Sequence, residues 1–198
     1  MLHELIEKRY SPRAFSEEPV EEEKIVSLLE AARWSPSSMN EQPWRFIVGV
    51  KGKGETFHKI YDTIFELNQV WAQNAPVLIL AVAKEFNDRN KQDNRYAEYD
   101  LGQAIAHLTL QATSLNLYLH QMGGFNPDKA RKLFNIPDDY IPISVIAVGY
   151  LGNVDALPEQ LKVREKAKRN RKELSELVFD ESFGHTSKLL GNENVSVN

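Results

Sequence analysis

Hydrophobic residues recur every three or four positions in several stretches of the chain, and this spacing predicts helices. The clearest stripe is Ile25, Leu28, Leu29 and Ala32, in a helix that begins at Pro19. Acidic residues fill the first turn of this helix, where they complement the helix dipole. The predicted helices cover residues 2–8, 19–35, 55–73, 98–119 and 128–134.

Three other stretches have the pattern of β-strands. Residues 44–50 alternate apolar and other side chains, as in a strand with one covered face. Residues 76–83 form a continuous apolar run, which is typical of a strand covered on both faces. A third strand is predicted over residues 143–150. The order of the elements predicts a small sheet with dominant helices, in an α+β or α/β fold.

The helix predicted over residues 98–119 is apolar almost all round its axis. Leu101, Ile105 and Leu108 form its main stripe, while Ala106 and Leu110 extend the apolar surface around the cylinder. A helix of this kind has to be covered on nearly every side. In a chain of 198 residues, a partner subunit is the expected source of that cover.

Composition excludes several classes of function. The chain carries 24 basic and 28 acidic residues, a net charge of −4, so no nucleic-acid or anionic membrane surface is expected. It has no cysteine, so any redox chemistry must come from a bound cofactor. His107 and His120 have no second ligand at helical spacing, and no metal site is predicted. No segment resembles a signal peptide or a membrane span, which predicts a cytoplasmic protein.

The loop over residues 35–44 is the first candidate for a binding site. It combines serine hydroxyls with the amides of Asn40 and Gln42, on a backbone stiffened by Pro36 and Pro43. Such a loop suits the edge of a planar heterocycle that alternates C=O and N–H groups. The same residue types are common in ordinary turns, and these ten residues alone favour the turn.

Two further segments carry candidate binding groups. Arg9 and Arg13 flank Ser11, and arginine forks beside a hydroxyl suit phosphate oxygens, although solvated surface arginines are the alternative. The adjacent glycines at 123 and 124 let the backbone approach a flat ligand, with a plain helix C-cap as the alternative.

Two polar segments accompany these candidates. Residues 84–94 are polar and irregular, which indicates a mobile loop or lid. Residues 158–172 are rich in Lys and Arg, and this run is either a solvated face or a source of cations for a phosphate.

The segments RYSPRAF, at residues 9–15, and WSPSSMNEQPWRF, at residues 34–46, together resemble the nitroreductase family of FMN-dependent oxidoreductases. The pattern R-x-S-x-R-x-F followed by A-x-x-S-P-S-x-x-N-x-Q-P-W is specific at this spacing. The resemblance continues through residues 74–76, 100–119, 123–125, 148–150 and 171–174. It implies an FMN-binding domain over residues 1–180 and a C-terminal tail over residues 181–198, for which wrapping of the partner subunit is one expected role.

The resemblance implies an α+β fold with a small, mainly antiparallel sheet flanked by helices. It also implies an intertwined homodimer, with the long helix and two FMN sites at the interface. In this family, hydride passes from NADH or NADPH to flavin N5, and electrons then pass to a nitroaromatic, quinone or similar acceptor in a ping-pong scheme. The hydride transfer needs no protein acid or base, so no catalytic side chain is assigned.

The resemblance assigns contacts to the FMN phosphate, ribityl chain and pyrimidine side to Arg9, Tyr10, Ser11 and Arg13. The loop would reach the FMN of the partner subunit through Pro36, Ser37, Ser38 and Asn40, with Gln42 in the same polar wall. The remaining expected contacts are Asn68 at the pyrimidine, Met122, Gly123 and Gly124 at the isoalloxazine, and Arg169 and Arg171 at the phosphate.

The chain departs from the family pattern at two positions. Trp71 stands where some relatives have a lysine near the pyrimidine edge, and Gly123 stands where many have a glutamate. These departures leave two alternatives open. In one, the same flavin site serves another reaction, such as reductive dehalogenation, enoate reduction or flavin-consuming chemistry. In the other, the chain is a non-enzymatic flavin-binding dimer.

Overall fold

The computed structural model describes residues 1–191, in two compact units: Met1–Glu165 and the segment that begins at Lys166. The expected boundary at residue 180 stays a prediction, and residues 192–198 of the expected tail lie outside the described residues. The helices are α1 (Glu4–Lys8), α2 (Glu22–Arg33), α3 (Thr56–Tyr61), α4 (Glu66–Ala72), α5 (Ala97–Ser114), α6 (Pro127–Phe134) and α7 (Glu159–Lys166). The strands are β1 (Trp44–Val50), β2 (Val77–Lys84), β3 (Tyr118–Met122) and β4 (Tyr140–Gly149).

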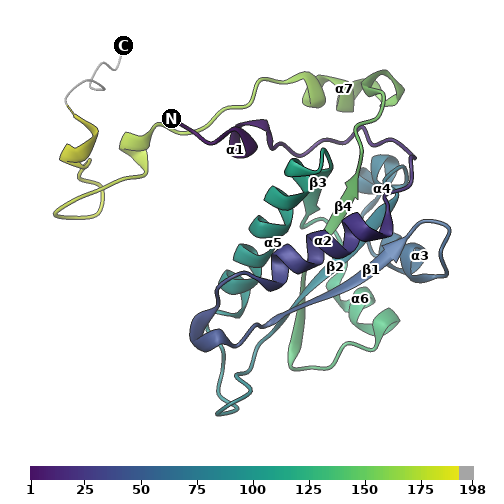
Figure 1. Ribbon diagram of the computed structural model, residues 1–198, viewed down its shortest axis with the longest axis horizontal. Coiled ribbons are helices and arrows are strands. Elements are labelled where there is room, and N and C mark those ends of the chain that lie inside the picture. The colour runs from purple at the N-terminus through teal and green to yellow at the C-terminus, as the bar shows by residue number, and fades with distance from the viewer. Residues whose placement is uncertain (192–198) are drawn as a thin grey trace. The chain divides into compact units, whose positions relative to one another are not determined.

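The four strands form one antiparallel sheet in the order β1-β2-β4-β3 (Figure 1). Strand β2 lies inside the sheet, where Val77 pairs with Val50 on one side and with Val148 on the other. Side chains from Val77 to Ala83 are buried, as the continuous apolar run predicts. The α+β class and the small antiparallel sheet are therefore confirmed.

Helices cover both faces of the sheet. One core cluster joins α2 and α5 to alternate residues of β2, including Ile79, and to Ile146 of β4. The other joins α3, α4 and α6 to the opposite set, including Leu80 and Val145. Figure 1 shows α2 and α5 side by side across the first face. The alternation of side chains along each strand thus divides one sheet between two cores.

The long helix is shorter than predicted. It ends at Ser114, and Asn116 adopts a left-handed conformation with φ of 59°. The N–H of Leu117 donates to the carbonyl of Ala112 at 2.8 Å, which closes the helix with a Schellman motif. Residues 118–122 then form β3, so residues 115–119 of the predicted helix lie outside α5.

Other boundaries also differ from the expected ones. The helix expected over residues 55–73 is broken into α3 and α4, because Ile64 forms a bridge with Phe125 and the N–H of Phe65 donates to Gly124. Strand β4 begins at Tyr140, three residues before the expected start. Its early residues pair with the end of β2, which extends the strand beyond its apolar part.

The segment that follows α1 is fastened to β3 and to the end of β4. The ring of His120 lies 4.5 Å from that of Trp71, and its Nδ1 lies 2.8 Å from the carbonyl oxygen of Pro12. That contact requires the proton on Nδ1. Three residues after Pro12, Phe15 bridges to Leu151, and the N–H of Gly152 donates to the carbonyl of Ala14 at 2.8 Å.

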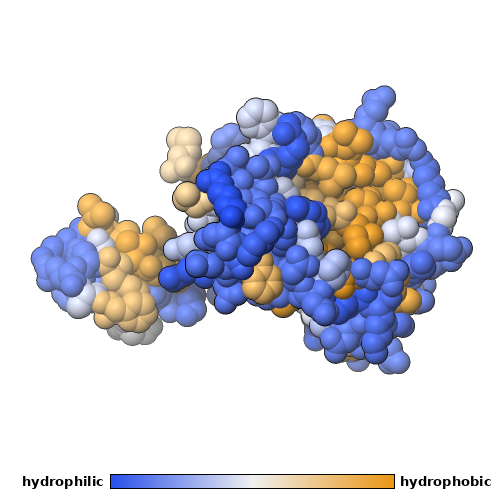
Figure 2. Space-filling model, turned by 90° about the horizontal axis from the view of Figure 1, so that it is seen from below, coloured by the Kyte–Doolittle hydropathy of each residue, from blue (hydrophilic) through white to orange (hydrophobic). Residues whose placement is uncertain are grey.

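Apolar side chains gather in a hollow on one face of the larger unit, inside a hydrophilic rim (Figure 2). Apolar areas of this kind on a protein surface mark contact or binding surfaces. None of the helices among the described residues has the length and apolar character needed to cross a membrane.

The second unit contains little regular structure. It has two short 3-10 helices, Leu174–Glu176 and Lys188–Leu190, and a bridge between Phe179 and Thr186. Leu174, Phe183 and Leu189 are exposed within it, and the rings of Phe179 and Phe183 pack at 5.0 Å.

We expect Gly152→Ala to destabilise the fold by about 1–3 kcal/mol, because an added Cβ would lie 2.3 Å from the Phe15 carbonyl oxygen. Urea unfolding measures the change. Leu151→Ala, at the exposed neighbouring position, is the control and should change stability much less. Equal unfolding midpoints for the two variants would contradict the close approach.

Stability should fall as the pH is lowered from 7 to 4, in part through His120. Burial lowers the pKa of His120 from 6.5 to about 4, so the unfolded chain takes up a proton that the folded chain does not. This difference removes on the order of 3 kcal/mol of stability between those two pKa values. His120→Gln, which can still donate to Pro12, should show a shallower loss in urea titrations at each pH. Identical pH profiles would refute the assignment.

Candidate functional site

The Arg9–Arg13 segment lies along the outer edge of the sheet. The ring of Tyr10 meets that of Tyr118 on β3 edge to face, with centroids 5.3 Å apart. The guanidinium Nη1 of Arg9 lies 3.3 Å from the hydroxyl of Ser11 and donates to it. These contacts place two of the expected phosphate ligands beside one another.

Arg13 is held by an acidic residue that the sequence reading did not single out. The carboxylate of Glu165, on α7, accepts hydrogen bonds from the backbone N–H of Arg13, 3.0 Å to each oxygen. The guanidinium of Arg13 lies 3.8 Å from the same carboxylate, and the Glu165 side chain is only 4% exposed. Glu165 lies inside a Lys/Arg-rich run 152 positions away, so no local pattern marks it.

Asn68 lies beside the glycine pair. A Cβ on Gly124 would lie 2.7 Å from Nδ2 of Asn68, so a larger residue there would displace the Asn68 amide. A Cβ on Gly123 would meet nothing within 4 Å, which leaves open space above this backbone. Met122 is only 2% exposed, backbone included, and its expected contact with a ligand stays a prediction.

Trp71 and His120 connect these two groups of residues. Trp71 lies one turn beyond Asn68 on α4 and contacts His120, which in turn contacts Pro12. Arg9–Arg13 and Asn68–Gly124 are therefore linked through packed side chains. Trp71 is fully buried, and its Nε1 has no hydrogen-bond partner among the described residues. It fills the core and supplies no cation where some relatives are expected to have a lysine.

The Pro36–Gln42 loop has an unusual backbone. Met39, Asn40 and Gln42 all have positive φ angles, 53°, 57° and 50°. The hydroxyl of Ser37 accepts from the N–H of Gln42 at 3.0 Å, and the buried carboxylate of Asp100 accepts from the N–H of Ser38 at 3.0 Å. Non-glycine residues in this region cost energy and often mark functional sites.

Within the described part of the chain, the side-chain amide of Asn40 has no hydrogen-bond partner and is exposed. That of Gln42 donates only to the carbonyl of Asn40, at 3.2 Å. Both amides therefore keep groups for further hydrogen bonds, and their expected contacts with a flavin stay a prediction.

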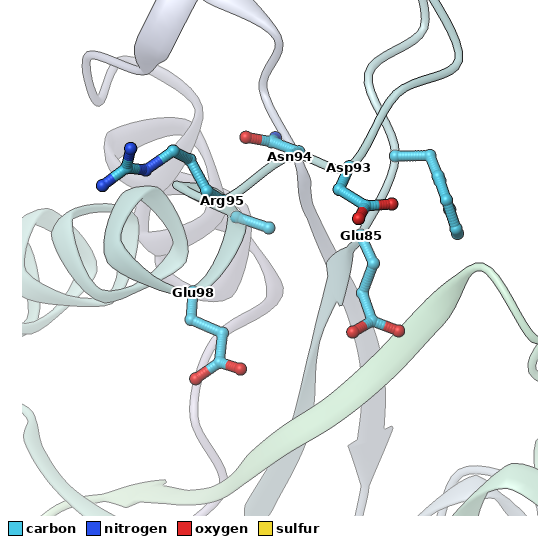
Figure 3. Close-up of a pocket in the computed structure, with 7 residues that line it drawn as sticks. Glu85, Asp93, Asn94, Arg95 and Glu98 are labelled. Atoms are coloured by element: carbon cyan, nitrogen blue, oxygen red, sulfur yellow. The ribbon is translucent and has the colours of Figure 1, made fainter.

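The residue 84–97 segment lies against this loop. Glu41 accepts from the N–H of Asp88 at 2.8 Å, and a hollow of about 270 Å³ lies between the two segments. A larger hollow of about 570 Å³ adjoins it and is drawn in Figure 3. It is lined by Glu85, Phe86, Asp93, Asn94, Arg95, Ala97 and Glu98.

The larger hollow has an acidic lining. The Arg95 side chain extends away from the carboxylates of Glu85, Asp93 and Glu98 (Figure 3). Nδ2 of Asn94 is buried and lacks a hydrogen-bond partner in the described structure. The hollow therefore favours neutral or cationic groups over anions.

The two parts of the candidate site lie at opposite ends of α5. Ser38 is bonded to Asp100, in the first turn of α5, whereas β3 and the glycine pair follow its last turn. An α-helix rises 1.5 Å per residue, so roughly 20 Å separates Asp100 from Ser114. A pocket lined by both parts within one chain would have to run the length of α5.

Arg169 and Arg171 belong to the second unit. Both are exposed, and Nη1 of Arg171 donates to the carbonyl of Asn170 at 2.6 Å. Their expected contact with a phosphate stays a prediction.

The same unit brings potential metal ligands from Asp180, Glu181 and His185 within 4.8 Å of one another. Nδ1 of His185 lies 3.1 Å from Asp180, and Lys188 pairs with Glu181 at 2.6 Å. These internal bonds account for the cluster without an ion.

Comparisons with known proteins identify the family of the chain. The model of the nitroreductase family matches residues 6–70 and 50–150. A putative NADH dehydrogenase/NAD(P)H nitroreductase from Methanothermobacter thermautotrophicus is 32% identical over 153 residues, which cover 74% of this chain and 75% of that protein. An iodotyrosine deiodinase from Thermotoga neapolitana is 42% identical over 171 residues, 76% of this chain and 88% of that protein.

A solved structure is also closely similar. The crystal structure of an oxidoreductase containing FMN superposes with a TM-score of 0.88 at 31% identity, over 94% of each chain. Sequence, fold and the family model agree along most of unit Met1–Glu165, and the chain belongs to the nitroreductase family.

Proposed function

We propose that the chain is an FMN-dependent oxidoreductase that binds its cofactor between the two subunits of a homodimer. It takes electrons from NADH or NADPH and passes them to nitroaromatic, quinone or similar electrophilic acceptors, in a ping-pong scheme and in the cytoplasm. The relatives named as an NAD(P)H nitroreductase and an oxidoreductase containing FMN support this activity class.

The observation that carries the proposal is the link between Arg9–Arg13 and Asn68–Gly124 through His120 and Trp71. The first segment offers guanidinium donors, and the second offers a side-chain amide beside open glycine backbone. We take these two linked segments as the candidate flavin surface. Those groups fit the phosphate of FMN and the edge of its flat ring. Bound FMN would supply the redox centre.

The protein's own groups would bind FMN, orient its ring and stabilise its reduced form. Arg13 is 24% exposed at the side chain and keeps guanidinium donors beyond its contact with Glu165. Its charge would stabilise the negative charge that reduction adds to the ring. The open backbone at Gly123 would let the ring lie close to the chain.

A second subunit would bring the Pro36–Gln42 loop to this surface. One side of α5 is uncovered within the described chain: Tyr99, Gly102 and Ala106 are exposed at helical spacing. Small residues allow another helix to approach closely. An antiparallel pairing of two α5 helices would place the loop end of one beside the β3 end of the other. The acidic hollow of Figure 3 would then lie near the acceptor.

Reductive dehalogenation is the second candidate, favoured by the 42% identity to iodotyrosine deiodinase. It would use the same flavin surface with a different acceptor. A panel of acceptors that includes 3-iodotyrosine separates the two, because iodide release measures dehalogenation directly.

The purified protein should absorb as a flavoprotein or take up added FMN, and should oxidise NADH or NADPH with menadione and nitroaromatic acceptors. Absorbance and steady-state oxidation rates measure both properties. A colourless protein that binds no FMN would refute the proposal. FMN binding without turnover of any acceptor would instead leave a flavin-binding dimer.

Mixing two defective variants tests the shared site. Arg13→Ala and Asn40→Ala should each weaken FMN retention at both sites, because each site would use Arg13 of one subunit and Asn40 of the other. In a mixed dimer, one site would carry both substitutions and the other neither. FMN binding should therefore return when the two variants are unfolded and refolded together, as measured by flavin fluorescence.

The control is each variant refolded alone, which should stay defective. If the mixture binds no more FMN than the two controls, Arg13 and Asn40 act within one chain, and the intersubunit site is wrong.

A further inference from the structure

A hollow of about 310 Å³ lies on the face of the sheet that α3 and α6 cover, apart from the candidate flavin surface. Ile47 of β1 and Val82 of β2 contribute its sheet side. Phe134, Ile136 and Pro137, from the connection between α6 and β4, form one wall. Its volume is at the lower end of the range of small-molecule sites.

The wall is held in place before any ligand binds. Arg131 donates from Nη1 to the carbonyls of Ile136 and Pro137, at 3.3 and 2.6 Å, and from Nη2 to that of Tyr140 at 2.6 Å. Asn135 ends α6 in the left-handed conformation, with φ of 50°. A pocket of fixed shape costs a ligand little conformational ordering.

One cation at this hollow has no carboxylate partner. The guanidinium of Arg45 lies 5.8 Å from the centre of the Tyr140 ring, and its Nη1 donates to the carbonyls of Gln42 and Trp44. Its Nε and Nη2 have no hydrogen-bond partner among the described residues. Arg33 and Arg131, by contrast, lie within 4.0 Å of Glu30 and Asp138.

A second cation stands on the same side of the sheet. Val82 pairs with Arg45 and Tyr140 with Lys84, so Arg45 and Lys84 project from one face. Nζ of Lys84 lies 5.7 Å from the centre of the Tyr140 ring and also pairs with Asp88. The positive potential at this end of the hollow thus comes mainly from Arg45.

We propose that this hollow binds a small aromatic carboxylate. The two unpaired N–H positions of Arg45 suit a carboxylate, which accepts a guanidinium fork side by side. The ring would lie against Ile47 and Val82, with Phe134 and Tyr140 as aromatic neighbours. A neutral analogue would lose the charge-assisted bonds, and a cation would be repelled.

The hollow is linked to the Pro36–Gln42 loop through the same arginine. Nη1 of Arg45 lies 3.0 Å from the carbonyl of Gln42, a residue with a positive φ. A carboxylate that draws on Arg45 would change this bond, so binding should alter the loop that the proposed flavin site uses.

The probe is 1-naphthoate, titrated into the full-length protein with FMN added and followed by calorimetry. We expect saturable binding that Arg45→Gln weakens about tenfold or more, as expected for a lost charge-assisted pair. Ile47→Trp should abolish binding by filling the hollow without changing Arg45. The matched control is Arg33→Gln. Arg33 ends α2, which packs against the other face of the sheet, and it is already paired with Glu30, so this variant should bind as the wild type does.

1-Naphthamide, which lacks the charge, should bind much more weakly than 1-naphthoate. Equal binding of the two compounds would overturn the proposal, as would unchanged affinity in both Arg45→Gln and Ile47→Trp. Displacement of naphthoate by nicotinamide mononucleotide would place the naphthoate over the flavin, and this result would also overturn the proposal. Circular dichroism of each variant confirms folding. The test does not depend on turnover, so it stands apart from the proposed oxidoreductase activity.

Discussion

Strand β2 runs through the inside of the sheet with every side chain from Val77 to Ala83 buried, four on one face and three on the other. Burying one aliphatic side chain contributes about 1.5–3 kcal/mol, so this run anchors both helical layers. It also leaves no room for polar chemistry between the layers. Ligand-binding groups are therefore confined to the edge strand β3, to the loops at the ends of α5 and to the margins of the helical layers.

Helix α5 separates the candidate binding residues into two groups, one at each of its ends. It lies along the sheet with Leu101 and Leu108 fully buried, and it carries the strained loop at one end and the edge strand beyond the other. Each end supplies half of the donors that a flavin phosphate and ring would need. In the proposed homodimer, a second copy would complete both halves through the uncovered side of α5.

The apolar run of β2, the stripe of α2 and the binding motifs were all readable in the sequence, because each depends on neighbours close in the chain. Residues 115–119 were misread, since Leu115, Leu117 and Leu119 fit a helix as well as a strand. Asn116 was the one local signal of the helix end. The division of residues 55–73 arises from contacts with Gly124 and Phe125, and Glu165 reaches Arg13 across 152 positions. Tertiary contacts of that kind produce no periodic pattern in the sequence, so they cannot be predicted from it.

The bond between Glu165 and the N–H of Arg13 joins residues near the start of the chain to a helix near the end of the larger unit. The buried carboxylate of Glu165 thus connects two segments that are separated by most of the sequence of that unit. Fraying of α7 and release of the Arg9–Arg13 segment thus become a single opening event. Hydrogen exchange at the Arg13 amide would report how often the last helix of this unit detaches, although that helix lies far away in sequence.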